Sequence, residues 1–165
     1  MSPTPTGRLI AAATGTDLTM TREFKAGIED VWASLTEPER TARWFAHWSG
    51  EGRPGATVRL KLTLEDGQPE SDMTIIACEP PRRLEVENID EYGRWHLKAR
   101  LEEAGGVTTL TFVHHLEPGA DPGSIGPGWE YYLDRLAALV LGTGAPEFDD
   151  YYPAQREYYE GLAAG

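Results

Sequence analysis

Several segments in the middle of the chain alternate apolar and polar residues with a period of two. Such alternation is typical of strands with one buried face. Turn-forming sequences stand between successive runs, among them Asp66-Gly67, Glu79-Pro80-Pro81 and Gly105-Gly106. Because short turns join neighbouring antiparallel strands, we expect a meander whose strands cover residues 57–64, 71–78, 84–88, 94–101 and 107–114. Two earlier strands are expected around residues 8–13 and 18–24.

Helical spacing occurs before and after this meander. Residues 28–45 predict two short helices, the second beginning at Pro38, where the missing N–H costs nothing. The Pro- and Gly-rich residues 117–128 are expected to form a loop, followed by a long helix over residues 129–141. The apolar stripe of that helix would consist of Trp129, Leu133, Leu136, Ala137 and Val140, and its solvent face of Glu130, Asp134 and Arg135.

This order of strand, two short helices, meander and long helix resembles the helix-grip fold of the START-like (SRPBCC, or birch-pollen-allergen-like) superfamily. Three segments are similar to its Activator of Hsp90 ATPase homologue-like branch, in the short bacterial stand-alone form: FKAGIEDVWASLTEPERTARWF at 24–45, CEPPRRLEV at 78–86 and GWEYYLDRLAALV at 128–140. The resemblance covers about residues 16–142. It implies an α+β fold in which a curved antiparallel sheet wraps a long C-terminal helix around an apolar cavity.

One START-like domain is expected to span residues 1–165, with a core over about 8–142 and an extension over 145–165. The extension mixes acidic residues with Phe148 and four tyrosines, which argues against a disordered tail. We expect it to pack back on the domain. It would either cover an apolar edge of the sheet or form a contact in a homodimer.

Charge and cysteine usage exclude several classes of function. The net charge of −12 repels phosphate, so nucleic acid is not expected as a partner. No apolar run is long enough for membrane insertion, and no signal peptide is recognisable. Cys78 is the only cysteine, so no internal disulfide can form, and a cytoplasmic location is expected.

Catalytic and metal-binding patterns are absent from the sequence. No nucleophile elbow, P-loop or zinc-binding motif occurs, and His114 and His115 are adjacent on a strand, so they should point to opposite faces. We therefore assign no catalytic residue, no metal ligand and no cofactor, and we regard enzymatic activity as the less favoured hypothesis. His114 and Asn88 are nevertheless expected on the inner face, either as satisfied core groups or as polar groups of a pocket.

The leading hypothesis is that the protein binds a small hydrophobic molecule between the sheet and the long helix. One alternative is a cyclase- or hydrolase-like enzyme using His114 with Asn88, and another is a co-chaperone-type interaction module. The expected ligand-binding residues are Leu62, Met73, Val86, Asn88, Trp95, Leu97, Phe112, His114, Trp129 and Leu133.

Overall fold

The computed structural model describes residues 3–90 and 93–164. Within these residues, the strands form one antiparallel sheet in the order β1-β2-β8-β7-β6-β5-β4-β3. Consecutive strands from β3 to β8 are paired, which confirms the predicted meander. The strands are β1 (Arg8–Ala11), β2 (Thr16–Phe24), β3 (His47–Ser49), β4 (Thr57–Lys61), β5 (Glu70–Glu79), β6 (Arg83–Asp90), β7 (Gly93–Ala104) and β8 (Val107–Leu116).

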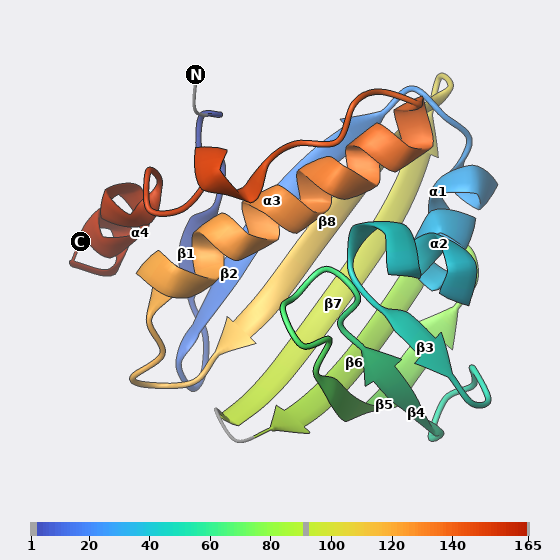
Figure 1. Ribbon diagram of the computed structural model, residues 1–165, viewed down its shortest axis with the longest axis horizontal. Helices are drawn as coiled ribbons and strands as arrows, with labels where there is room; N and C mark the ends of the chain where they lie inside the picture. The colour runs from blue at the N-terminus through green and yellow to red at the C-terminus, as the bar shows by residue number, and fades with distance from the viewer. Residues whose placement is uncertain (1–2, 91–92, 165) are drawn as a thin grey trace.

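Helices cover one face of this sheet. Figure 1 shows α3 lying along that face, with α1 and α2 at one end and α4 near the N-terminal segment. The predicted helix-grip α+β architecture is therefore confirmed. The helices are α1 (Ile28–Thr36), α2 (Pro38–Trp44), α3 (Pro122–Leu141) and α4 (Arg156–Ala164), with a short 3-10 turn at Phe148–Asp150.

The strand predicted over residues 57–64 is shorter than expected. β4 ends at Lys61 because its partner β5 begins at Glu70, directly after Pro69, which has no N–H to donate to a ladder. Leu62 therefore lies outside the strand, half-buried against the core. The short strand β3 was not predicted from the sequence, since three residues cannot display a period of two.

Helix α3 begins at Pro122 rather than at Trp129, so the predicted loop over 117–128 was wrong for its second half. The side chain of Asp121 caps the helix by accepting a hydrogen bond from the Gly123 amide at 3.0 Å. Pro122 occupies the first helical position, where a proline is tolerated. Gly126 lies so close to Tyr159 that a Cβ there would fall 2.6 Å from its ring, so glycine serves close packing of α4.

The predicted solvent face of α3 is also wrong at Glu130, whose side chain is 1% exposed. The C-terminal extension packs back on α3, as expected, and the N-terminal segment lies beside it. Arg22 and Tyr159 hydrogen-bond the Glu130 carboxylate at 2.7 and 2.6 Å, and Thr6 donates to it as well. Because these partners are distant in sequence, helical spacing alone could not reveal that this face is covered.

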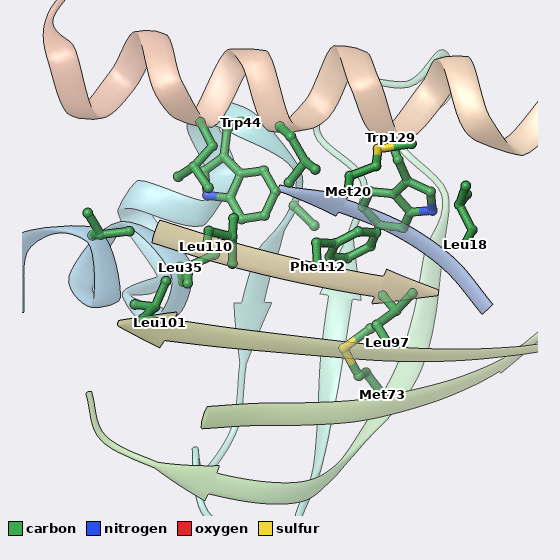
Figure 2. Close-up of a cluster of buried hydrophobic side chains, with 14 of the residues drawn as sticks. Leu18, Met20, Leu35, Trp44, Met73, Leu97, Leu101, Leu110, Phe112 and Trp129 are labelled. Atoms are coloured by element: carbon green, nitrogen blue, oxygen red, sulfur yellow. The ribbon is translucent and has the colours of Figure 1, made fainter. Parts of the chain in front are cut away.

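The apolar core lies between the sheet and α3 (Figure 2). Leu133 and Leu136 of the predicted stripe are 1% and 0% exposed, and Leu97, Leu110 and Phe112 of the sheet belong to the same buried cluster. The faces predicted from alternation are therefore the buried ones. In the described part of the chain, no helix has the length and apolar character required to cross a membrane.

Candidate ligand-binding cavity

A cavity of about 420 Å³ lies between the sheet and the helices. This volume falls in the range of small-molecule sites. Its floor comes from strands β4 to β8 and its roof from α3, while α1, α2 and β3 close one side. The apolar side chains of the wall include Trp32, Leu35, Trp44, Phe45, Trp48, Val58, Leu60, Met73, Ile75, Leu84, Val86, Leu97, Ala99, Leu110, Phe112, Trp129 and Leu133.

Two tryptophans, at the end of α2 and in β3, have their indole N–H groups bonded to backbone carbonyls of α1. Trp44 Nε1 donates to the Ser34 carbonyl and Trp48 Nε1 to the Thr36 carbonyl, both at 2.8 Å. The hydroxyls of Thr36 and Thr41 also donate to nearby backbone carbonyls. At these four side chains the cavity wall therefore offers a ligand apolar surface rather than free donors.

Trp129 forms the central part of the roof. Its ring centroid is 4.5 Å from that of Phe112 and 5.5 Å from that of Phe45, in tilted arrangements favourable for aromatic pairs. Figure 2 shows Trp129 between α3 and the sheet, directly above Phe112. Trp129 Nε1 donates to His114 Nδ1 at 2.9 Å, so the histidine holds the indole in place.

His114 is 2% exposed and neutral at physiological pH. Burial, assisted by the nearby His115 and His96, lowers its pKa to about 4. Because Nδ1 accepts the Trp129 N–H, the proton of the neutral ring sits on Nε2. Trp95 stacks on the same ring, with centroids 4.9 Å apart. His114 therefore acts as a buried hydrogen-bond partner behind the cavity wall.

The cavity opens to the surface where its lining residues are exposed, at Glu37, Gly52 and Pro80. Trp48 borders this mouth and packs on Gly52, where an added Cβ would fall 2.9 Å from the indole. Cys78 lies just inside the mouth, and burial raises the pKa of its thiol. At neutral pH the thiol stays protonated and is a poor nucleophile.

The structure brings six of the ten predicted ligand-binding residues to the cavity wall: Met73, Val86, Leu97, Phe112, Trp129 and Leu133. The other four lie outside the lining. Leu62 follows the end of β4, and Trp95 and His114 stack on each other behind Trp129. Asn88 is buried and follows the lining residue Val86 by two residues, on the same face of β6.

Sequence reasoning missed the wall contributed by α1, α2 and β3. Trp32, Trp44, Phe45 and Trp48 form it. Four aromatic residues within seventeen positions are a composition signal that could have marked this wall. Their positions over the sheet depend on the long crossover from β2 to the opposite sheet edge, which spacing does not encode.

His115 and His96 lie on the opposite face of the sheet from His114, as the adjacent positions predicted. His115 Nδ1 is 2.7 Å from Asp17 Oδ1, and His96 Nε2 is 2.6 Å from Glu85 Oε2. Burial alone would raise the pKa of Glu85, but the hydrogen bond with His96 and the nearby charges of Lys98 and Arg83 together outweigh it and lower the pKa. No group of three or more His, Cys, Asp or Glu side chains within residues 3–90 and 93–164 is arranged to hold a metal ion.

The elements around this cavity match a known protein family. A model of the family described as Activator of Hsp90 ATPase homolog 1-like protein matches residues 25–141, which run from the segment before α1 to the end of α3. The chain belongs to this family. The predicted resemblance is confirmed, and every element that lines the cavity falls within the matched residues.

Solved structures of other proteins share this fold. The crystal structure of CalU16 from Micromonospora echinospora is 25% identical, with a TM-score of 0.76 and 98% of each chain covered. DynU16, a protein of the dynemicin biosynthetic locus, is 26% identical with a TM-score of 0.67, over 83% of this chain and 50% of its own. A Bordetella parapertussis protein at 24% identity shares the fold, with a TM-score of 0.74 over 97% and 94% of the two chains. Among curated proteins, none matches the chain.

Proposed function

We propose that the protein binds a small hydrophobic molecule in the cavity between the sheet and α3. The observation that carries this proposal is a cavity of about 420 Å³ with a largely apolar wall, in which the indole N–H groups of Trp44, Trp48 and Trp129 are already bonded within the protein. An apolar ligand binds favourably against such a wall because its apolar surface is removed from water. A polar ligand would lose hydrogen bonds to water there without gaining new ones, so its binding free energy would be small. The likeness to DynU16, from a biosynthetic locus, fits a small-molecule ligand better than a protein client.

The positions of the polar groups favour binding over proton transfer. His114 lies behind Trp129 with Nδ1 engaged, and Cys78 carries a raised thiol pKa. A general acid or base must reach the reacting atom within about 3 Å or through one water. Neither the His114–Asn88 enzyme hypothesis nor the co-chaperone hypothesis draws support from a specific feature of the cavity.

Binding of the neutral dye N-phenyl-1-naphthylamine tests the proposal. Burying about 300 Å² of apolar ligand surface contributes about 7 kcal/mol at about 25 cal/mol per Å², before ordering costs. We therefore expect dissociation constants of about 10–100 µM, read from the rise in dye fluorescence.

The variant Ala99→Phe fills the cavity from β7, because Ala99 lines it between Leu97 and Leu101 on the same strand face. Dye affinity should fall at least about tenfold while the melting temperature changes little, since the added ring enters existing space. Arg100→Phe is the matched control, with the same side chain on the opposite, exposed face. Equal dye affinities for wild type and Ala99→Phe would place the binding site elsewhere.

A further inference from the structure

A buried amide lies directly beyond the deep end of the cavity. Asn88 on β6 is paired in register with Met73 on β5, and Val86 precedes it by two residues on the same sheet face. Met73 and Val86 both line the cavity, whereas Asn88 does not. Asn88 is therefore the next inward-facing position of β6 beyond the cavity floor, beside the lining residue Met73.

The Asn88 amide has one polar atom without a partner. The side chain is 7% exposed, and Nδ2 donates to Ser71 Oγ at 2.6 Å. Its Oδ1 makes no hydrogen bond. Reversing the amide would only exchange the unpaired atom, because the Ser71 hydroxyl can donate as well as accept. A buried, unpaired amide is costly and calls for a compensating role.

The other unpaired buried atoms in the described part of the chain are not in a comparable position. Gln155 Oε1 belongs to the C-terminal extension, where the same side chain donates to the Pro3 carbonyl. Arg135 Nε is on α3, in a side chain that bonds the Arg43 carbonyl. Neither residue has a strand neighbour that lines the cavity. Asn88 alone among the three could meet a molecule bound there.

The cavity floor also indicates how long a ligand that reaches Asn88 must be. Leu84 and Pro80 lie near the mouth, and the lining continues along β6 through Val86 towards Asn88. From Leu84 to Asn88 the strand rises by about 13 Å, at about 3.3 Å per residue. Met73 lines the far end of the cavity beside Asn88, and its unbranched thioether side chain can change rotamer at low cost.

We propose that Asn88 is the polar end of the ligand site and pairs with a hydroxyl or amine at the buried tip of an elongated apolar molecule. This inference rests on the proposed function. The ligand class is then a rigid hydrophobe about 10–13 Å long with one hydrogen-bond donor at its leading end. Met73 moves aside when that end enters, and the ligand donor satisfies Asn88 Oδ1.

Three probes of equal width test the proposal by displacement of N-phenyl-1-naphthylamine: biphenyl, 4-hydroxybiphenyl and 4-methoxybiphenyl. Wild type should bind 4-hydroxybiphenyl about fivefold more tightly than 4-methoxybiphenyl, which lacks a donor. Asn88→Leu should remove this preference, bind biphenyl at least as well as wild type, and unfold at no lower a temperature. Met73→Ala should enlarge the preference for 4-hydroxybiphenyl, because the shorter side chain opens space beside Asn88 and leaves its amide unchanged.

Gln155→Met is the matched control, since it removes a buried amide with one unpaired oxygen that lies away from the cavity. It should keep the wild-type preference. The proposal is overturned if wild type does not distinguish the two substituted biphenyls, or if Asn88→Leu retains the preference. If biphenyl itself does not displace the dye and the dye does not bind, the proposed function fails together with this inference. If biphenyl binds but the protein does not distinguish 4-hydroxybiphenyl from 4-methoxybiphenyl, the proposed function stands and only the role of Asn88 is refuted.

Discussion

The role of individual side chains around the cavity depends on hydrogen bonds that cannot be seen in the sequence. His114 is the main example. It was expected on the inner face, and it is there, but its Nδ1 accepts the Trp129 N–H instead of facing the cavity. The consequence is a buried neutral imidazole whose pKa lies near 4, well below that of a histidine in an unfolded chain.

The lowered pKa of His114 predicts a loss of stability in acid. Between about pH 6.5 and pH 4 the unfolded chain binds a proton at this residue and the folded protein does not, so the free energy of unfolding falls as the pH drops. At about 1.4 kcal/mol per pH unit, this loss is about 3 kcal/mol across the window. Urea unfolding at several pH values measures it.

The variant His114→Gln isolates this contribution, because its amide oxygen can still accept the Trp129 N–H but does not titrate. Between pH 6.5 and 4 it should lose about 3 kcal/mol less than wild type, while carboxylates affect both proteins alike. Parallel pH profiles for the two proteins would mean that His114 binds its proton over the same pH range in the folded and the unfolded chain.

At the scale of elements, α3 holds the structure together through two different faces. One face is apolar and roofs the cavity, while the other presents Glu130 to Arg22, Thr6 and Tyr159. Burial alone would raise the pKa of Glu130, but hydrogen bonds from Tyr159, Arg22 and Thr6 outweigh it and keep the pKa below its usual value. The carboxylate therefore joins the N-terminal segment, β2, α3 and α4.

Replacing Glu130 by Gln should destabilise the protein by about 2–3 kcal/mol. The amide cannot neutralise Arg22, and its own N–H₂ group meets the amides of Thr6 and Gly7, which also donate. Chemical denaturation measures the change. Glu157→Gln, an exposed position on α4, is the control and should stay within about 0.5 kcal/mol of wild type. Equal losses in both variants would show that the Glu130 network contributes nothing to stability.

At the scale of the whole molecule, one sheet, its covering helices and the two terminal segments form a shell around an apolar interior. Stability then comes from burial of apolar surface and from the Glu130 network. Treatment with EDTA should leave the melting temperature unchanged in differential scanning calorimetry. A drop of several degrees that zinc reverses would reveal a metal site that the described residues do not show.

Much of the fold could be predicted because alternation and helical spacing are local. Leu97, Leu110 and Phe112 face the core as their period-two pattern indicated, and Leu133 faces it as the helical stripe indicated. The start of α3 could not be predicted in this way, because Pro122 at its first position is compatible with both a loop and a helix. The Asp121 cap and the close contact between Gly126 and Tyr159 settle that choice.

The candidate site was also predictable only in part. The sequence alone determined which faces of the strands and of α3 are apolar, because side-chain direction follows backbone period. The tertiary structure alone shows that Trp44, Phe45 and Trp48 complete the wall, that Glu130 is covered, and that Asn88 is buried beside Met73. These outcomes depend on segments brought together by the crossover between sheet edges and by the return of the chain ends. Contacts between residues so far apart leave no periodic trace in a single sequence.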